Sequence, residues 1–366
     1  MRKTGFICDE SYFWHDAGNG ALVLPPGGYV QSDGSAESPE SKRRFKNLME
    51  RSGLYDKLEL IKPGPATHEQ LMYFHTEAHI ERVKKLSISG GGDCGSLAIV
   101  GNGSYEIAVL AAGGAITAVD AVVKGKCDNA YALTRPPGHH AEADRGMGFC
   151  IFNNAAIAAL YARKELGLER VMVIDWDVHH GNGTEDAFYS DPNVLFISLH
   201  QEKLYPAGRG EIDQIGEGAG EGYTVNIPLP AGCGDAGYMY ALERVVKPVA
   251  DKFKPQIIII SAGQDANMFD PAARMMVTAD GYKRMTEFMM QLADVHCGGK
   301  LAAIHEGGYS TPYVPFCSHA IVEVMSGVKT DVEDPFYPVF AATPYNELSE
   351  QQKAIVEKCR EKHIRD

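Results

Sequence analysis

The chain has 366 residues, with 35 Lys and Arg against 48 Asp and Glu, and a net charge of −13 when the histidines are neutral. Apolar residues make up 45% and charged residues 23%, an ordinary globular composition that excludes a disordered chain. The acidic balance argues against nucleic acid as a partner, because phosphate binding needs clustered Lys and Arg, and it weakly favours a cationic ligand.

The N-terminal segment and the cysteines indicate a cytoplasmic protein. Asp9 and Glu10 appear before a signal-peptide apolar region can develop. No run reaches the roughly 18 uninterrupted apolar residues of a membrane span. The chain has 8 cysteines, none in a C-x-x-C pair, so we expect reduced thiols rather than disulfides or a cysteine zinc site. We therefore expect a cytoplasmic protein that does not associate with membranes.

Loops and helical patterns can be assigned along the chain. Pro25 to Glu40 is rich in Gly, Pro and Ser and predicts a long loop, which is either a surface excursion or part of a site rim or subunit contact. Thr67 to Gln70 and Ser349 to Gln352 have the capping-box pattern that starts a helix. Further helical patterns cover Tyr105–Val123, Asn154–Leu166, Ala236–Phe253 and Ala279–His296. Pro248 is expected to kink or divide the third of these helices.

Short apolar runs between the helices predict strands, at Tyr131–Arg135, Val171–Asp177, Val194–His200, Tyr223–Pro228, Gln256–Ser261 and Leu301–His305. Several of them, such as VMVID and IIII, are apolar on both faces. That pattern is typical of a parallel sheet covered by helices on both sides. Strand–helix alternation over the whole chain predicts a single doubly wound α/β domain spanning residues 1–366.

Polar side chains directly follow four of the predicted strands. In an open parallel sheet the ligand binds outside the carboxyl ends of the strands, so these side chains are expected to share one rim. They come with glycines, which let the backbone approach a ligand closely. The residues are His139 and His140, then Asp175, Asp177 and His179, then Gln264 and Asp265, and finally Glu306 and Tyr309.

Asp177, His179 and Asp265 predict a metal site. Asp175, Asp177 and His179 point the same way if their strand continues, and carboxylates this close repel each other unless a cation lies between them. With Asp265 from another strand end, three ligands leave a position open for water and substrate, which is the catalytic rather than the structural pattern. The alternative is a set of strand-end caps and salt bridges, which the convergence of these residues disfavours.

The paired histidines and Tyr309 suit acid–base chemistry beside such a metal. His139 and His140 follow a Pro-Pro-Gly turn and are natural general base and general acid next to an activated water. Asp175 is expected to orient one of them, as a carboxylate orients a catalytic histidine. The Tyr309 hydroxyl is expected to donate a hydrogen bond to a developing oxyanion. Taken singly, each residue would more often be an ordinary polar group at a strand end or in a loop.

These residues resemble the arginase/deacetylase superfamily and, within it, the zinc-dependent histone deacetylases. The chain is most similar to the class II branch and to bacterial histone deacetylase-like amidohydrolases. The N-terminal GFICDESYFWHD is also similar to the family. The matching motifs occur in the family's order over about 175 residues: RPPGHHAE (135–142), GMGFCIFNN (146–154), VIDWDVHHGNGT (173–184), ISLHQ (197–201), SAGQDAN (261–267) and HEGGY (305–309).

The resemblance implies a role for each residue of the reacting centre. The metal ligands are Asp177, His179 and Asp265. The catalytic residues are His139, His140, Asp175 and Tyr309, the last of which stabilises the oxyanion.

The resemblance also implies positions for the substrate and for a second ion. Phe149 and Tyr205 line a narrow tunnel for the acyl-lysine stem, with Tyr205 where the family usually has Phe, and the Gly148 carbonyl accepts the substrate amide N–H. The implied substrate-binding set is Gly148, Phe149, Tyr205, Gln264, Gly307 and Asp93. A potassium ion behind the zinc is implied at Asp175, Asp177, His179, Ser198 and Leu199.

Three positions depart from the family's pattern. Asn182 stands where class I enzymes have an Asp, so His140 is expected to lack a buried carboxylate partner, as in class II. Gln264 stands where class II members usually have Phe, and its amide is expected to meet the acyl group, the alternative being that it caps nearby backbone. Ala272 occupies the place of a gatekeeper Glu in polyamine-specific relatives, which weakens a polyamine substrate.

The resulting hypothesis is a metal-dependent amidohydrolase that removes acetyl or a related short acyl group from the ε-nitrogen of lysine in a peptide or protein. Zn(II) is the expected metal, with Fe(II) or Co(II) possible at a site of two Asp and one His. Three alternatives stay open: deacylation of a small acetylated amine such as an acetylpolyamine, a non-catalytic acyl-lysine binding module, and an arginase-like two-metal hydrolase. A homo-oligomer is possible by analogy.

Overall fold

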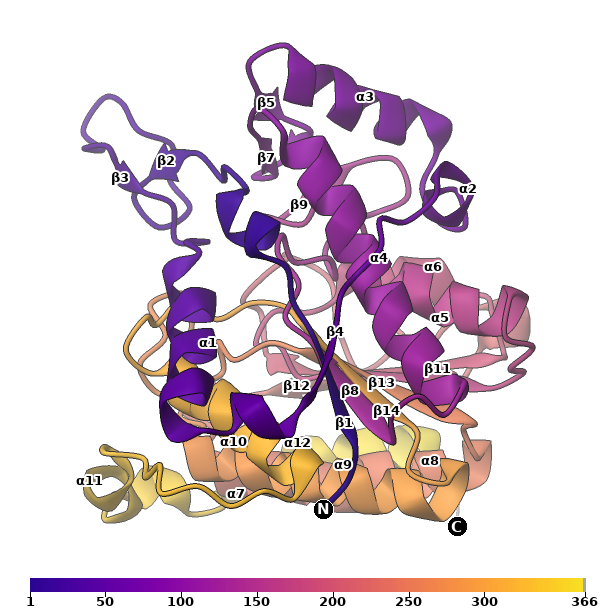
Figure 1. The fold of residues 1–366 in the computed structure, drawn as a ribbon. Helices are drawn as coiled ribbons and strands as arrows, with labels where there is room; N and C mark the ends of the chain where they lie inside the picture. The colour runs from indigo at the N-terminus through magenta and orange to yellow at the C-terminus, as the bar shows by residue number, and fades with distance from the viewer. Residues whose placement is uncertain (365–366) are drawn as a thin grey trace.

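Eight parallel strands form the central sheet of the computed structural model, which describes residues 1–364 (Figure 1). Their order across the sheet is β12-β11-β10-β13-β14-β8-β1-β4, and every neighbouring pair is parallel. The strands are β1 (Thr4–Ile7), β4 (Glu59–Ile61), β8 (Asn129–Ala132), β10 (Val171–Asp175), β11 (Val194–Gln201), β12 (Thr224–Leu229), β13 (Ile257–Ala262) and β14 (Leu301–His305). Short two-stranded pairings join β2 (Asn19–Gly20) to β3 (Asp33–Gly34), β5 (Gly92–Asp93) to β7 (Ile99–Val100), and β6 (Gly95–Ser96) to β9 (Gly146–Met147).

Helices cover both faces of the sheet, as the two-sided apolar strands require. Met172 and Ile174 of β10 pack on one layer, and Val171 and Val173 pack on the other, because successive side chains alternate faces. The first layer contains α1 (Glu40–Ser52), α7 (Asp235–Ala241), α8 (Lys247–Phe253), α9 (Ala279–Cys297), α10 (Val314–Ser326) and α12 (Glu350–His363). The second contains α4 (Ser104–Val123), α5 (Asn154–Lys164) and α6 (Asn182–Phe188). The remaining helices are α2 (His68–Leu71), α3 (Glu77–Ile88) and α11 (Tyr337–Ala341).

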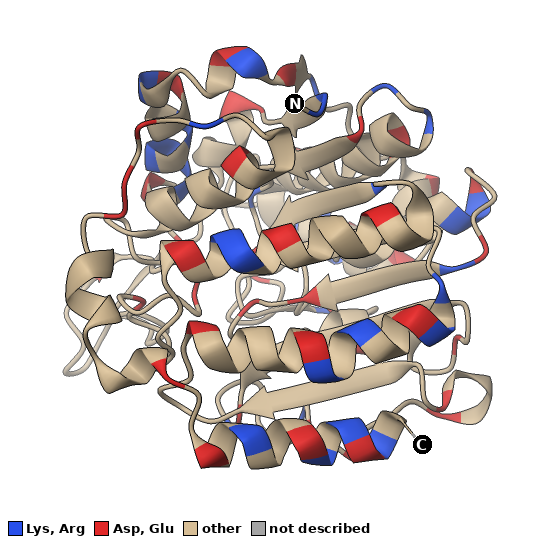
Figure 2. Cartoon of the chain, turned by 90° about the horizontal axis from the view of Figure 1, so that it is seen from below, with Lys and Arg blue, Asp and Glu red and all other residues tan. Residues whose placement is uncertain are grey.

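Charged residues are confined largely to the outer helices and loops. Figure 2 shows positive and negative residues interspersed along the helices in view, whereas the strands between them carry few. The parallel sheet with helices on both faces confirms the doubly wound α/β fold predicted from the sequence.

Helix α4 is long and apolar enough to cross a membrane by length and composition alone. It has 20 residues, and its most apolar stretch has a mean hydropathy of 1.8. However, 67% of that stretch is buried inside the protein, where its alanines pack against β8 and α5. The helix therefore serves as a core element, and it is the only one among the described residues that meets these criteria.

The structure corrects the predicted elements at several points. Strands β1 and β4, the short two-stranded pairings and helices α1, α3, α6, α10 and α11 were not predicted. The strand predicted to continue to Asp177 ends at Asp175, because the Asp177 N–H donates to the Asp175 carboxylate (3.0 Å) instead of to a neighbouring strand. The helix expected over 236–253 is divided by one wide π-helical turn, Leu242–Val246, directly before α8 and its Pro248. The long loop ends one residue early, since Glu40 begins α1.

Candidate active site

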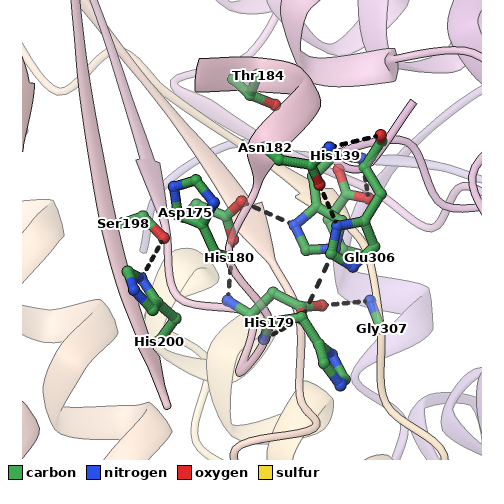
Figure 3. Close-up of polar contacts among 12 residues, drawn as sticks. His139, Asp175, His179, His180, Asn182, Thr184, Ser198, His200, Glu306 and Gly307 are labelled. Atoms are coloured by element: carbon green, nitrogen blue, oxygen red, sulfur yellow. Dashed lines mark hydrogen bonds and ion pairs between the residues drawn. The ribbon is translucent and has the colours of Figure 1, made fainter. Parts of the chain in front are cut away.

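The carboxyl ends of β8, β10, β13 and β14 bring the predicted site residues to one rim. Figure 3 shows His139, Asp175, His179 and Glu306 gathered there. These four strands are neighbours in the sheet, so segments separated by more than 120 residues in the chain lie side by side. The rim holds His139 and His140 after β8, Asp175, Asp177 and His179 at the end of β10, Asp265 after β13, and Glu306, Gly307 and Tyr309 after β14.

Asp177, His179 and Asp265 form a compact, buried group of potential metal ligands. One ligand atom from each lies within 4.8 Å of the others. His179 Nδ1 is 3.2 Å from Asp177 Oδ1 and 3.0 Å from Asp265 Oδ2. Backbone donors fix both carboxylates, because the Val178 N–H donates to Asp265 Oδ1 and the Gly307 N–H to Asp177 Oδ2, each at 2.8 Å. One imidazole nitrogen and two carboxylates are a donor set that suits a divalent metal with an open position.

Two glycines lie so close to the metal-ligand group that a side chain at either position would collide with a ligand carboxylate. A Cβ on Gly307 would lie 2.3 Å from Asp265 Oδ2, and a Cβ on Gly263 would lie 2.2 Å from Asp177 Oδ2. Neither position can therefore carry a side chain without moving a ligand. Gly307 was predicted to bind substrate. In the structure its N–H donates to the Asp177 carboxylate.

A second group of potential ligands lies behind the first, formed by His139, Cys150 and Glu306. Two of its donor atoms are already engaged: His139 Nδ1 lies 2.9 Å from an oxygen of Asp175, and Glu306 Oε2 accepts two backbone N–H groups. Glu306 Oε1 has no partner among the described residues. Burial raises the pKa of the Cys150 thiol well above its ordinary value, which disfavours the thiolate that a metal binds. This group does not match the second carboxylate-rich site of a two-metal hydrolase.

The two adjacent imidazoles have opposite electrostatic environments. Burial lowers the pKa of His139, but the carboxylates of Asp177 and Asp175 raise it by more, so that it lies well above its ordinary value. Burial and the neighbouring His139 and His179 lower the pKa of His140 well below its ordinary value. The ring centroids are only 4.0 Å apart, so two imidazoles in contact have pKa values displaced in opposite directions.

Asn182 fixes the tautomer of His140. Its Oδ1 lies 2.8 Å from His140 Nδ1, and its Nδ2 donates to Glu142 Oε1 at 2.9 Å, which orients the amide. His140 Nδ1 therefore carries the proton, and Nε2 keeps a lone pair. The expected absence of a carboxylate partner for His140 agrees with this geometry.

Glu306 and Asn153, to which the sequence assigned no role, hold the histidine turn in place. Glu306 Oε2 accepts the N–H groups of Gly138 (2.6 Å) and His139 (3.1 Å), which joins this turn to the loop that carries Tyr309. Asn153 caps α5, and its Nδ2 donates to the carbonyls of His139 and Ala141. Both residues lie within motifs quoted above, HEGGY and GFCIFNN, and this was the sequence feature that could have indicated their importance.

Tyr309 faces the metal-ligand group from the loop after β14. Asp270 Oδ2 accepts its backbone N–H at 2.8 Å, a contact that the sequence did not reveal. Its ring packs edge-on against Phe149 and His179, with centroids 5.7 and 6.4 Å away. Burial and nearby carboxylates raise the pKa of the Tyr309 phenol well above its ordinary value, so the hydroxyl stays protonated and can donate.

A narrow pocket of about 220 Å³ leads to these groups. A side chain at Gly148 would collide with His140, since its Cβ would lie 2.6 Å from Cδ2. Phe149 and Tyr205, the expected tunnel residues, both line the pocket. The full lining is Leu22, Val23, Ala36, Leu97, His140, Gly148, Phe149, His179, Leu204, Tyr205, Ala272 and Tyr309.

Gln264 does not point into this pocket, contrary to the orientation favoured from the sequence. It is fully buried, and its Nε2 donates to the carbonyl of Ala262 (2.5 Å) and to Tyr131 Oη (3.4 Å). Its Oε1 has no partner among the described residues. The physical reason is that the chain turns behind Gly308 after β13, which directs residue 264 into the core and residue 265 toward the rim.

Replacing Gln264 by phenylalanine is therefore expected to leave the ranking of acyl substrates unchanged. The substitution alters core packing behind the glycine loop but touches no pocket atom. Acetyl, propionyl, butyryl and trifluoroacetyl lysine peptides assayed on both proteins check this. A changed order of kcat/KM would place the side chain at the acyl group after all.

The Asp93 carboxylate organises its own loop. Its carboxylate accepts the backbone N–H groups of Gly95 (2.9 Å), Leu97 (2.9 Å) and Ala98 (3.1 Å), and so folds its own loop. The side chain remains exposed at the protein surface, so its predicted contact with substrate stays a prediction.

The residues expected around potassium lie together behind the metal-ligand group. Asp175 and Ser198 are register partners in the neighbouring strands β10 and β11, and Leu199 follows in the buried part of β11. Asp175 Oδ1 accepts the Asp177 N–H, and Ser198 Oγ lies 2.9 Å from His200 Nδ1 (Figure 3).

Comparisons with known proteins agree with this geometry. A model described as the histone deacetylase domain matches residues 35–325. A histone deacetylase-like amidohydrolase from Pseudomonas aeruginosa is 50% identical over 91% of this chain and 89% of its own. A probable deacetylase from Archaeoglobus fulgidus is 42% identical over 82% of this chain and 84% of its own. Among solved structures, the HD domain of HDA15 superposes with a TM-score of 0.86 and 33% identity, over 99% of this chain and 94% of that one.

Proposed function

Because the chain belongs to the histone deacetylase family, we propose that it hydrolyses acyl-lysine, releasing acetate or a related short carboxylate from the ε-nitrogen. The family and the relatives support a deacetylase of the amidohydrolase type. One observation carries the finer proposal: a neutral imidazole, a phenol and a three-residue metal-ligand group converge at the floor of a narrow apolar pocket. We also propose that the whole chain acts as one catalytic domain.

Asp177, His179 and Asp265 are proposed to hold the catalytic metal. Zinc fits this donor set, and Fe(II) or Co(II) can replace it at a site with two carboxylates and one imidazole. When bound, such an ion supplies Lewis acidity to the acyl carbonyl and lowers the pKa of water.

The paired histidines are proposed to move the protons. His140 is neutral, with the lone pair of Nε2 available, so it accepts the proton of the attacking water and later gives it to the leaving amine. His139 is oriented by Asp175, whose carboxylate together with that of Asp177 raises the pKa of the imidazole, and its charged form would stabilise the negative charge that develops on the acyl oxygen. The Tyr309 hydroxyl donates a hydrogen bond to that same oxygen.

The pocket walls are proposed to position the lysine stem. Phe149 and Tyr205 flank its methylene groups, and the Gly148 carbonyl accepts the substrate amide N–H. Behind the floor, we propose that Asp175, Ser198 and the backbone near Leu199 hold a potassium ion, which offsets the close carboxylates.

Replacing Asn182 by aspartate is expected to shift the pH dependence of this reaction. The new carboxylate would raise the pKa of His140, which acts only when neutral, so the acidic limb of kcat/KM should move to higher pH. Opposite charges at this distance shift a pKa by about 1–3 units. A pH–rate profile of both proteins at saturating zinc measures the change. An unmoved acidic limb would show that another group is the base.

The main rival substrate is a small acetylated amine such as an acetylpolyamine. Among the described residues, none of those lining the pocket carries a carboxylate that could pair with a polyamine's second ammonium group. Position 272, where a gatekeeper carboxylate would stand, is alanine and lines the pocket. These observations support acyl-lysine.

Competition kinetics between an acetyl-lysine peptide and an acetylpolyamine test the assignment on metal-quantified protein. We expect kcat/KM to favour the peptide by at least about tenfold, the discrimination of a modest pocket contact. A preference for the polyamine would reassign the substrate, and turnover of neither would favour a binding module.

A further inference from the structure

Strained backbone is concentrated around the pocket. Among the described residues, five other than glycine hold a positive φ angle, and three of them line the pocket: Leu22 (57°), Leu97 (57°) and Phe149 (68°). A fourth, Lys203 (54°), directly precedes two pocket residues. Bulky side chains rarely adopt this conformation, and such strain persists mainly at ligand sites. The concentration indicates that the pocket needs these side chains where the strained backbone places them.

Leu22 occupies the tip of a tight turn in the loop between β2 and β3. The Ala21 N–H donates to the Leu24 carbonyl (2.9 Å), and the Leu24 N–H donates back to the Ala21 carbonyl (3.0 Å). Glycine or asparagine is preferred where such a two-residue turn needs a positive φ. A leucine therefore occupies a position whose backbone conformation disfavours it, and the side chain of this leucine lines the pocket.

Leu97 is held on the pocket by two fixed contacts. The Asp93 carboxylate accepts its N–H (2.9 Å), and its carbonyl accepts the Phe149 N–H (2.7 Å). Asp93 thus acts by positioning Leu97, and Leu97 is tied to a tunnel residue. Figure 1 shows the loops that carry Leu22 and Leu97, between β2 and β3 and between β5 and β7, at the same end of the molecule.

The pocket changes from polar to apolar toward solvent. His140 and His179 at its floor are 4% and 9% exposed, whereas Leu22 and Val23 are each 41% exposed. Leu97 and Leu204 are half-buried. We call the four apolar residues at the mouth, Leu22, Val23, Leu97 and Leu204, the collar.

We propose that the collar binds an apolar side chain on the residue next to the acylated lysine of a peptide. The inference rests on the proposed function, since the lysine stem then fills the tunnel and the flanking residue meets the mouth. Covering the exposed apolar surface of Leu22 and Val23 would contribute favourably to the free energy of peptide binding.

The four collar residues themselves offer no charged partner to a charged flanking residue. The lining contains no Lys, Arg, Asp or Glu among the described residues. Two nearby carboxylates are engaged by backbone, Asp93 in its own loop and Asp270 on Tyr309 and Ala272. Burying an unpaired charge is unfavourable, so the collar selects against charged and strongly polar neighbours.

The test compares acetyl-lysine peptides that differ only in the flanking residue, leucine or asparagine, on the zinc-loaded enzyme. The wild-type protein should favour the leucine peptide by about tenfold in kcat/KM, the discrimination expected of one apolar contact. In Leu22→Asn the ratio should fall below about threefold, because asparagine keeps the positive φ but removes the apolar side chain. Leu97→Asn is a second variant of the same design. Because each ratio is measured within one preparation, a reduced active fraction does not affect it.

Leu24→Asn is the matched control. Leu24 belongs to the same turn and is 56% exposed, but it does not line the pocket, so the tenfold ratio should survive. A wild-type enzyme that deacetylates both peptides equally, or a Leu22→Asn variant that keeps the full preference, would overturn the collar while leaving the proposed function standing. Failure to turn over either peptide would overturn the proposed function and the collar with it.

Discussion

Replacing Asp265 by alanine is expected to abolish deacylation and to remove most of the bound metal. The change deletes one of three ligands in a group whose donor atoms lie within 4.8 Å of each other. A metal Lewis acid contributes several kcal/mol to the transition state, so turnover should fall by at least about 10³-fold. Metal analysis of the purified variant and a turnover assay measure both effects.

Two further variants separate ligand loss from misfolding. Asp265→Asn keeps an acceptor for the Val178 N–H and loses only charge, so it should fold as the wild type does and still bind metal weakly. Asp235→Asn also alters a buried carboxylate that accepts a backbone N–H, from Thr278, but outside the ligand group, and should retain its metal. Stoichiometric zinc and wild-type turnover in Asp265→Ala would remove Asp265 from the site.

Replacing Tyr309 by phenylalanine is expected to lower kcat by about 10²–10³, the usual effect of deleting one oxyanion donor. The ring and its contacts with Phe149 and His179 remain, so metal content and KM should change little. Steady-state kinetics at a fixed zinc concentration measure kcat and KM separately for both proteins.

Tyr161→Phe serves as the control for this variant. Tyr161 donates to Asp120 (2.6 Å) on α4, far from the pocket lining, and its loss should not affect kcat. If Tyr309→Phe matches this control, the hydroxyl does not meet the reacting carbonyl and the role assigned from the HEGGY motif fails.

The central sheet could be predicted from the sequence because its strands are apolar on both faces. The runs VMVI (171–174) and IIII (257–260) carry that pattern, and the structure confirms a strand at each, β10 and β13. Strand β1 begins with Thr-Gly, and β4 has three residues including Glu59, so neither has a pattern that separates a strand from a loop. Strand β1 pairs with β8 and β4 pairs with β1, and both pairings join segments far apart in the chain, which no local window contains.

The reacting groups could also be predicted, because the carboxyl ends of parallel strands meet at one edge whatever the details of the helices. The direction in which each side chain points was harder to predict from the sequence. Gln264 directly precedes Asp265, and the sequence does not show that the turn behind Gly308 directs one into the core and the other to the rim. The roles of Asp93 and Asp270 were missed for a related reason, since each carboxylate is committed to backbone N–H groups within loops.

Metal reconstitution of the purified protein tests the central claim most directly, namely that one divalent ion held by Asp177, His179 and Asp265 makes this chain an acyl-lysine deacylase. The protein is stripped with a chelator, and acetate release from an acetyl-lysine peptide is followed as zinc is added back. The account predicts negligible turnover without metal and a rise that reaches its plateau at one zinc per chain. Full turnover by the stripped protein, a plateau only at two zinc ions per chain, or no acetate release at any zinc level would contradict it.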